Sequence, residues 1–399
     1  MHPHEHRRGR HGETMVAGRA DDGLSKYESQ ALSLPASRRG QGCFPYRKYG
    51  GFWYPEHLMA ATLAMRDTFA ARPSDVILAT MPKSGSTWLK ALVYAVVRRG
   101  RHLVPAAGPG RARGVHGDHP HELVPAAGPG RARGVHGDHP HELVPAAGPG
   151  RARGVHGDHP LLASSPHELV PFLHDLYNGG PLLRLEDEEG TPSPRVLAVH
   201  AAFTALPASV PESGCRVVYL CRDPKDAFVS LRHYLDDIKP KGSAMTPLAE
   251  AFDLFCDGVS PFGPVWDHMA GYWKESVARP EEVMFLRYED LKEDAVGSVR
   301  RLAEFLGCPF TGEEVAGGVP EAVVALCSMD RMRSVQANRD GLHGTESWSF
   351  KNSAFFRKGE VGDWKAHLTP EMAQRLDAIV EDKLRGSGLS LLTVTRNGI

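Results

Sequence analysis

The chain has 399 residues, and its 47 Lys and Arg residues nearly balance its 48 Asp and Glu residues, for a formal net charge of −1 at pH 7. This balance argues against a general nucleic-acid binder, which uses a basic surface to neutralise phosphates. No apolar run in the sequence is long enough for a membrane span. Its six cysteines show no CxxC or framework spacing, so we expect reduced thiols and a cytoplasmic protein.

The N-terminal segment is polar. Its first 30 residues lack the apolar core of a signal peptide and the acid-free, Ser-rich pattern of a transit peptide, and Met15 is an alternative start to Met1. We expect residues 1–44 to form a disordered tail and residues 45–395 to form one domain. Without the tail and the internal repeat described below, roughly 320 residues remain, which suits one large α/β domain rather than two.

The stretch from Asp75 to Lys90 is the most informative part of the chain. It predicts an apolar strand at 75–80 and a helix at 87–98 whose apolar residues have the spacing of a face packed on a sheet. The turn between them contains one cation and four small residues: Lys83, Ser84, Gly85, Ser86 and Thr87. Short side chains allow backbone N–H groups and the positive end of the helix to converge on one anion. The turn therefore predicts a P-loop-like phosphate-binding loop.

This loop differs from the nucleoside triphosphate loop G-x-x-x-x-G-K-[ST], in which the lysine follows the second glycine. In this chain Lys83 comes before Gly85. The order disfavours a P-loop kinase. An ordinary strand-to-helix turn with incidental serines is the alternative that this segment, taken alone, leaves open.

A tandem repeat follows the predicted helix. The unit Leu-Val-Pro-Ala-Ala-Gly-Pro-Gly-Arg-Ala-Arg-Gly-Val-His-Gly-Asp-His-Pro begins at positions 103, 123 and 143, a period of twenty residues. Each copy is rich in Gly and Pro and lacks a helical or alternating apolar pattern, so it cannot bury a core as a solenoid repeat does. We interpret residues 101–160 as a flexible surface loop expanded in tandem. Because its histidines and arginines are copies, their number is weak evidence for metal or RNA binding.

Strands alternate with helices in the rest of the chain. The pattern predicts a helix around 166–177, strands at 195–200 and 216–221, a helix at 223–236, helices through 246–278, a strand at 283–287, a helix at 292–306 and a last helix capped by Thr369. This order predicts an α/β fold, in which a single domain has a central parallel sheet flanked by helices.

One histidine ends a predicted strand. His200 closes the apolar run at 195–200, and the loops at the carboxyl edge of a parallel sheet build its sites. Imidazole titrates near neutrality, so His200 is the candidate general base. A structural role is the alternative for a lone histidine at a strand end.

Two further segments place cations beside turns. Between Val217 and Ser230, Arg222 lies at a strand tip, followed by Asp223 as N-cap and Pro224 at the first helical position. The segment Arg357-Lys-Gly-Glu-Val-Gly-Asp-Trp-Lys begins with two cations and a glycine. Alone, a strand-end arginine is usually a surface charge and Arg-Lys-Gly is a weak signal.

Together these segments resemble the plant cytosolic sulfotransferases over about residues 45–390. Pro-Lys-Ser-Gly-Ser-Thr-Trp at 82–88 is similar to the family's 5′-phosphosulfate loop, 217–230 to its 3′-phosphate segment, and 357–365 to its RKGxxGDWK signature. The resemblance implies transfer of the sulfuryl group of 3′-phosphoadenosine 5′-phosphosulfate (PAPS) to a hydroxyl of a small organic acceptor. It gives no reason to require a metal.

The resemblance also implies residue roles. The cofactor-binding residues it implies are Lys83, Ser84, Gly85, Ser86, Thr87, Trp88, Arg222, Ser230, Tyr288, Arg357, Lys358 and Gly359. Arg222 and Ser230 would hold the 3′-phosphate, while Trp88 and Tyr288 would hold adenine. His200 would deprotonate the acceptor, and Lys83 would neutralise charge on the leaving phosphate oxygen.

Some positions depart from the family pattern. Ala198 replaces a lysine of animal members, Met329 replaces an adenine-stacking Phe, and Ala201-Ala-Phe replaces a polar, proline-bearing run. The acceptor therefore stays open among flavonoid, steroid, jasmonate and phenol-like molecules. A decayed paralogue that binds the product nucleotide PAP without transfer is the alternative. Pro370 and Gln374 alter the family's dimer motif KxxxTVxxxE, so we expect a monomer.

Overall fold

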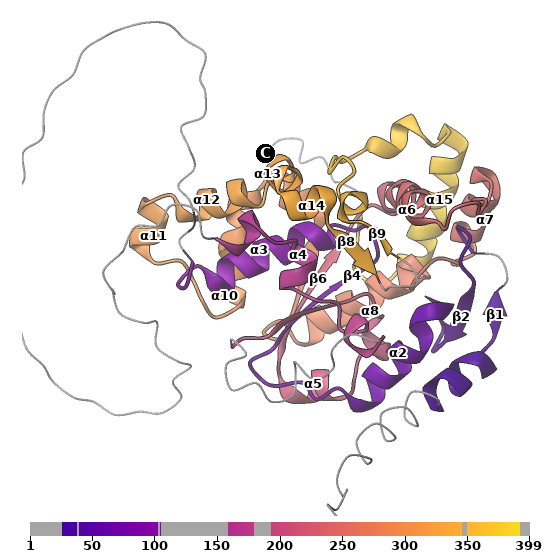
Figure 1. The fold of residues 1–399 in the computed structure, drawn as a ribbon, viewed down its shortest axis with the longest axis horizontal. Helices are drawn as coiled ribbons and strands as arrows, with labels where there is room; N and C mark the ends of the chain where they lie inside the picture. The colour runs from indigo at the N-terminus through magenta and orange to yellow at the C-terminus, as the bar shows by residue number, and fades with distance from the viewer. Residues whose placement is uncertain are drawn as a thin grey trace, which may run out of the picture.

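A computed structural model describes residues 26–37, 40–102, 104, 159–178, 193–344 and 349–391. Most of the repeat, residues 105–158, lies outside the described residues, so the structure does not bear on our interpretation of that loop. Figure 1 shows the strands β4 and β6 near the centre, with α3, α4 and α10 on one side and α2 and α8 on the other. No helix in the described ranges has the length and apolar character needed to cross a membrane.

The central sheet has four strands, and all of them are parallel. Their spatial order is β5 (Val196–Val199), β4 (Val76–Thr80), β6 (Arg216–Cys221) and β7 (Val283–Arg287). In the register, Ile77 pairs with Leu197 on one side and with Val217 on the other. The predicted α/β fold with a parallel sheet between helices is confirmed.

The two faces of the sheet pack into separate cores. Ile77, Leu197 and Tyr219 belong to one buried cluster, which includes side chains of α2 (Glu56–Thr68), α8 (Val265–Ala278) and α15 (Pro370–Leu384). Leu78 and Val218, one residue away along the strands, belong to the other. That cluster includes α3 (Ser86–Arg98), α10 (Ala295–Phe305) and α12 (Val319–Leu326). Because side chains alternate across a strand, a strand buried on both faces needs the continuous apolar run seen in the sequence.

The remaining elements of the described chain surround this body. They are β1 (Ala36–Ser37), β2 (Tyr46–Tyr49), β3 (Phe52–Pro55), η1 (Pro160–Leu162), α4 (Pro166–Leu169), η2 (Asp175–Tyr177), η4 (Phe203–Ala205), α5 (Ser209–Ser213), α6 (Pro224–Ile238), α7 (Leu248–Cys256), α9 (Tyr288–Glu293), α11 (Gly312–Ala316), α13 (Met329–Ser334), α14 (Gln336–Asp340), β8 (Leu342–Gly344), β9 (Ser349–Lys351), η5 (Asn352–Phe355) and η6 (Asp363–Ala366).

The folded body begins before residue 45, earlier than the sequence indicates. Strand β1 pairs with β2, and Tyr27 and Ala31 are buried in the core. The side chain of Arg47 donates hydrogen bonds to the carbonyls of Leu32 and Leu34 at 3.0 and 2.9 Å. Tyr27, Ala31 and Arg47 therefore attach part of the predicted tail to the core. The polar average composition of the tail gave no indication of these contacts.

The prediction of one helix around 166–177 is wrong. Helix α4 ends at Leu169, and Phe172 then forms a parallel bridge with Ala198 of β5. Pro171 explains the break, since proline has no N–H for a helix and biases the residue before it toward extended backbone. The bridge brings this segment to the end of β5, next to His200.

The carboxyl ends of the four parallel strands lie at the same edge of the sheet. Strand β4 leads to the loop with Lys83, β5 to His200, β6 to Arg222 and β7 to Tyr288. Four residues named from separate sequence motifs therefore meet at one edge, which is where open parallel sheets place their ligands.

Candidate active site

The loop after β4 has a constrained backbone. Lys83 has φ of 67° and Gly85 has φ of 102°, both in the left-handed region. A Cβ on Gly85 would lie 2.8 Å from Cδ2 of Tyr288, so this position has no room for a side chain. Gly85 is also the residue that precedes the first turn of α3, whose free N–H groups face the loop.

A pocket lies at the start of α3. Its walls are Lys83, Gly85, Ser86, Thr87, Trp88, Arg222, Ser230, Tyr288, Met329, Met332, Phe355, Arg357, Lys358 and Gly359. We call it the nucleotide pocket. Of the predicted cofactor-binding residues, Ser84 alone does not line it: Ser84 is buried, and its N–H donates to the carbonyl of Met81 at 3.2 Å. Met332 and Phe355 are wall residues that the sequence did not single out.

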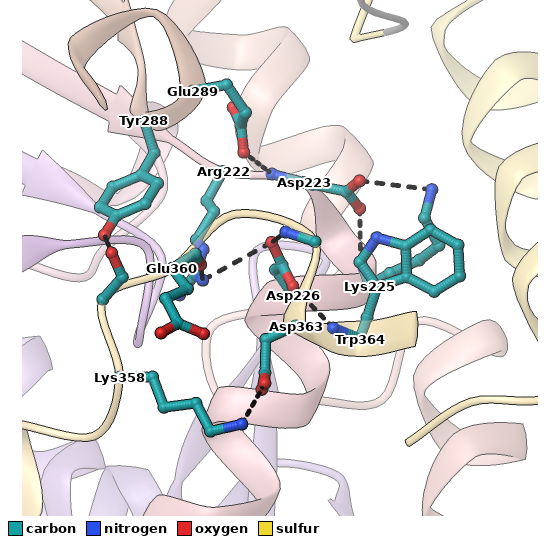
Figure 2. Close-up of polar contacts among 12 residues, drawn as sticks. Arg222, Asp223, Lys225, Asp226, Tyr288, Glu289, Lys358, Glu360, Asp363 and Trp364 are labelled. Atoms are coloured by element: carbon teal, nitrogen blue, oxygen red, sulfur yellow. Dashed lines mark hydrogen bonds and ion pairs between the residues drawn. The ribbon is translucent and has the colours of Figure 1, made fainter. Parts of the chain in front are cut away.

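Arg222 is a buried wall residue of the nucleotide pocket. It is 5% exposed, and its Nη2 donates to the carbonyl of Glu360 at 2.6 Å while Nη1 donates to the carbonyl of Lys83 at 3.3 Å. The guanidinium lies 4.6 Å from the ring centre of Tyr288, whose hydroxyl donates to the carbonyl of Gly359 at 3.0 Å (Figure 2). One arginine thus joins the loop after β4 to the segment that follows η5.

Asp226, which sequence reasoning missed, fixes that segment to α6. Its carboxylate is fully buried and accepts hydrogen bonds from the backbone N–H groups of Gly362 and Trp364 at 2.7 and 3.0 Å (Figure 2). It also lies 3.6 Å from Nη2 of Arg222, four residues earlier on the chain. Arg222 lies before Asp223, the N-cap of α6, so the i,i+4 rule for charges on one helix did not mark this pair in the sequence.

Asp363 is a second missed carboxylate. It forms an ion pair with Lys358 (Figure 2) and another with Arg357. Burial alone raises a carboxyl pKa, but the hydrogen bonds from these two cations lower the pKa of Asp363 to about 2. The cations of the RKG segment therefore have an anionic partner within the chain.

Lys83 lies in the wall that separates the nucleotide pocket from a neighbouring cavity. Its Nζ donates to the carbonyl of Ala354 at 3.4 Å and lies 4.3 Å from the ring centre of Tyr234. Burial lowers the pKa of Lys83 to about 7, and the positive charges of Arg357 and Arg222 add to the effect. A bound anion would stabilise the protonated form.

The neighbouring cavity has a volume of about 150 Å³, and we call it the acceptor cavity. Its walls are Phe44, Tyr46, Pro55, His57, Leu58, Pro82, Lys83, Ser86, Thr87, His167, Phe172, His174, Asp175, His200, Leu231, Tyr234, Leu235, Ile238, Pro261, Phe262, His343, Phe350 and Phe355. Lys83, Ser86, Thr87 and Phe355 line both spaces. The two spaces therefore meet at the start of α3.

His200 lies in the acceptor cavity with a defined orientation. Its Nδ1 is 2.8 Å from the carbonyl oxygen of Thr80. Because a carbonyl only accepts, Nδ1 carries the proton, and Nε2 of the neutral ring keeps its lone pair. Burial lowers the pKa of His200 well below its usual value, helped by His174, Lys90 and His268, while the bond to Thr80 opposes the shift. His200 is thus a neutral imidazole at pH 7, the form that accepts a proton.

A row of three hydrogen-bonded side chains, Thr87, His167 and Lys90, leads from the loop into the core. His167 lies 3.0 Å from Oγ1 of Thr87 through Nε2 and 3.2 Å from Nζ of Lys90 through Nδ1. Lys90 is fully buried, and burial lowers its pKa well below the usual value. The row fixes the hydroxyl of Thr87, which lines both spaces.

Metal-binding groups do not gather in the described part of the chain, where no cluster of three or more His, Cys, Asp or Glu side chains has a metal-binding arrangement.

The chain belongs to the sulfotransferase family, since the family model named "Sulfotransferase domain" matches residues 73–388. It is an enzyme of sulfuryl transfer. Within this family it is similar to Cytosolic sulfotransferase 15 of Arabidopsis thaliana, with 38% identity over 372 residues that cover 93% of this chain and 88% of the relative. It is 33% identical to Flavonol 3-sulfotransferase of Flaveria bidentis over 349 residues, covering 87% of this chain and 94% of the relative. The predicted resemblance to plant cytosolic sulfotransferases is confirmed.

Solved structures agree with this assignment. A structure assigned to a steroid sulphotransferase of Arabidopsis thaliana superposes with a TM-score of 0.62 at 30% identity, covering 91% of this chain and 94% of that one. A mouse sulfotransferase complexed with PAP has a TM-score of 0.55 at 22% identity, covering 86% of this chain and 95% of that one. At that identity the mouse structure shows the shared fold.

Proposed function

We propose that this protein transfers the sulfuryl group of PAPS to a hydroxyl of a small acceptor bound in the acceptor cavity. The observation that carries the proposal is the shared wall: Lys83, Ser86 and Thr87 line both the nucleotide pocket and the cavity that contains His200. A group held at this wall is within reach of ligands in both spaces. Positioning of two reactants in line is the main requirement of such a transfer.

In this proposal the nucleotide pocket holds PAPS at both of its phosphates. The backbone N–H groups of the loop and Lys83 bind the 5′-phosphosulfate, as helix N-termini bind anions. Arg222, Ser230, Arg357 and Lys358 bind the 3′-phosphate, because guanidinium groups give charge-assisted bonds to a dianion. Gly359, in the same segment, leaves room for the ligand.

Adenine stacks on Trp88 of α3, beside Tyr288 of α9. The rings of Trp88 and Tyr288 are 5.7 Å apart in an edge-to-face arrangement, so one ring face of Trp88 is the stacking surface. Met329 and Met332 line the same pocket and cover the base with polarizable thioethers. This set accepts a purine without a phenylalanine at position 329.

His200 acts as general base and Lys83 stabilises the leaving group. Nε2 of His200 takes the proton of the acceptor hydroxyl while the oxygen forms a bond to sulfur. The bond between sulfur and the 5′-phosphate oxygen breaks, and Lys83 neutralises the charge that grows on that oxygen. The products are the sulfate ester and PAP, and the proton on imidazole then leaves to solvent. The cations and imidazole perform these steps without a metal.

The acceptor cavity suits a hydroxylated ring. Aromatic side chains such as Phe172, Phe262 and Phe355 line it, which fits flavonoid, steroid, jasmonate or phenol-like molecules. We also propose that the protein acts in the cytoplasm as a monomer and without a nucleic-acid or membrane partner.

The test is turnover of PAPS with a panel of phenols, flavonoids, steroids and hydroxy-jasmonates, followed by mass detection of the sulfate ester and of PAP. We expect both products in equal amounts with at least one class. Tight PAP binding without any sulfated product across the panel would favour a binding protein and contradict the proposal.

A further inference from the structure

The acceptor cavity contains one carboxylate. Among the described residues that line it, Asp175 is the only Asp or Glu, and its side chain is 38% exposed. It begins η2, directly after His174 and three residues after Phe172. This acid faces the space in which the acceptor would bind.

No Lys or Arg of the described residues forms an ion pair with Asp175, although the buried Lys90 is near enough for the carboxylate to raise the lysine's pKa against the lowering effect of burial. The ion-pair partners of Asp175 among the described residues are two histidines: Nε2 of His174 at 3.4 Å and Nε2 of His343 at 3.8 Å. Burial lowers the pKa of both rings, although Asp175 itself raises them. Both imidazoles are therefore neutral at pH 7, so neither adds a positive charge beside Asp175.

Asp175 and His200 lie at different places along the cavity. The ring of His174 is 6.3 Å from the ring of His200, and its Nε2 is 3.4 Å from the carboxylate of Asp175. Phe172 and Phe262 contact His200 at ring distances of 4.4 and 5.3 Å, and they give an aromatic acceptor its flat walls. An acceptor that extends from His200 past His174 would place its opposite end near Asp175.

Lys83 does not cancel the charge of Asp175. It lies at the shared wall, where the phosphosulfate group would be its partner. With nucleotide bound, the acceptor would meet an anionic donor at one end and an anionic carboxylate at the other.

We propose that Asp175 selects phenolic acceptors that carry an ammonium group at the end remote from the reacting hydroxyl, and that it disfavours acceptors with a carboxylate there. The inference rests on the proposed sulfuryl transfer and names the acceptor class of that same site. An ammonium gains a charge-assisted bond to the carboxylate, whereas a second carboxylate placed beside it is repelled.

Three acceptors of nearly equal size test this selection: tyramine, tyrosol and 4-hydroxyphenylacetate, which end in an ammonium, a hydroxyl and a carboxylate. We expect kcat/KM to fall in that order, with about a tenfold step or more between the first and the last. Asp175→Asn keeps the shape and removes the charge, so the three values should converge. Asp340→Asn is the matched control, because Asp340 is an exposed acid near His343 that does not line the cavity.

Calorimetry of the same three molecules with the PAP-loaded enzyme separates the inference from the proposed function. Tighter binding of tyramine than of 4-hydroxyphenylacetate, lost in Asp175→Asn, supports the inference independently of turnover. Equal affinities in the native chain, or an unchanged order in Asp175→Asn, would overturn it. Preference for tyramine in binding, with no sulfated product from any phenol, would overturn the proposed function alone.

Discussion

The nucleotide pocket and the acceptor cavity share a wall but are built in different ways. The nucleotide pocket offers cations and backbone N–H groups. It uses short segments that follow β4, β6 and β7, and α13 and the segment at 355–359 complete its walls. The acceptor cavity draws on the N-terminal strands, the segment around Phe172, the α6 helix and the hairpin of β8 and β9. A phosphate is recognised by groups that a local motif can arrange, whereas a flat acceptor is recognised by the shape that distant segments make together.

The largest effect is expected in the acceptor cavity. His200→Ala should lower kcat by at least about a hundredfold, the usual range for loss of a general base. PAP affinity should be almost unchanged, because His200 lines the acceptor cavity and not the nucleotide pocket. Steady-state turnover and calorimetry with PAP measure the two quantities. A variant that keeps more than about a hundredth of native kcat would refute the assignment of the base.

The next largest effect is expected for the arginines that are proposed to bind the 3′-phosphate. Arg222→Ala and Arg357→Ala should each weaken PAPS binding by about 10- to 150-fold, from bonds worth roughly 1.5–3 kcal/mol. Adenosine 5′-phosphosulfate, which lacks the 3′-phosphate, should lose less. Arg222→Lys is the control, since it keeps the charge next to Asp226 but loses the fork. If binding of both nucleotides were weakened equally, these arginines would not be the groups that bind the 3′-phosphate.

Lys83 provides a pH test of the shared wall. The pKa of Lys83 is lowered to about 7 in the ligand-free protein, whereas in the unfolded chain it keeps its higher ordinary value. Between these two values the unfolded chain binds more protons, so the contribution of Lys83 to folding stability improves as pH rises from about 7 and is most unfavourable below it. A bound phosphate should restore the proton.

We therefore expect PAP binding at pH 8 to take up as much as about one proton, measured by calorimetry in buffers of different ionisation enthalpy. Lys83→Met should abolish the uptake and weaken PAP, and it should stabilise the ligand-free protein below pH 7. Proton uptake of the same size in Lys83→Met would assign the titration to another group.

The smallest effect concerns the repeat, whose described residues line neither space. The rings of His102 and His159, on either side of it, are 5.7 Å apart, so the ends of the segment are already close. Deleting residues 121–160 joins Pro120 to Leu161 and puts His119 in place of His159 with the same Gly-Asp-His-Pro sequence. Loop-closure entropy then predicts a stability change of at most about 1 kcal/mol. Unfolding or loss of nucleotide binding in this variant would mean that the repeats are structural.

Sequence reasoning succeeded where one segment contains a whole interaction. Lys83, Gly85 and Thr87 sit in one turn, and Asp223 caps α6 by accepting from the N–H of Lys225, as its place before Pro224 predicted. Most of the sheet and its flanking helices followed from the same local rules of apolar spacing and capping. These features depend on neighbours within a few residues.

It failed where a contact joins distant parts of the chain. Phe172 reaches His200 only because Pro171 ends a helix and the segment pairs with β5, which turned a predicted helix into an edge of the sheet. His343 and Phe355 enter the acceptor cavity from the C-terminal third of the chain. Apolar and histidine side chains have no spacing that marks them as walls of one cavity. Because the cavity could not be recognised in the sequence, its carboxylate Asp175 was not singled out either.

The internal ion pairs of the nucleotide pocket have a consequence for how its affinity responds to salt. Arg222 already lies near Asp226, and Arg357 and Lys358 already hold Asp363. A phosphate that binds here replaces these carboxylates as the partner of the cations, or shares the cations with them. Few of the cations were neutralised only by mobile counterions before the phosphate bound. Screening weakens both the old pairs and the new ones. Ionic strength should therefore change nucleotide affinity less than the number of basic side chains in the pocket indicates.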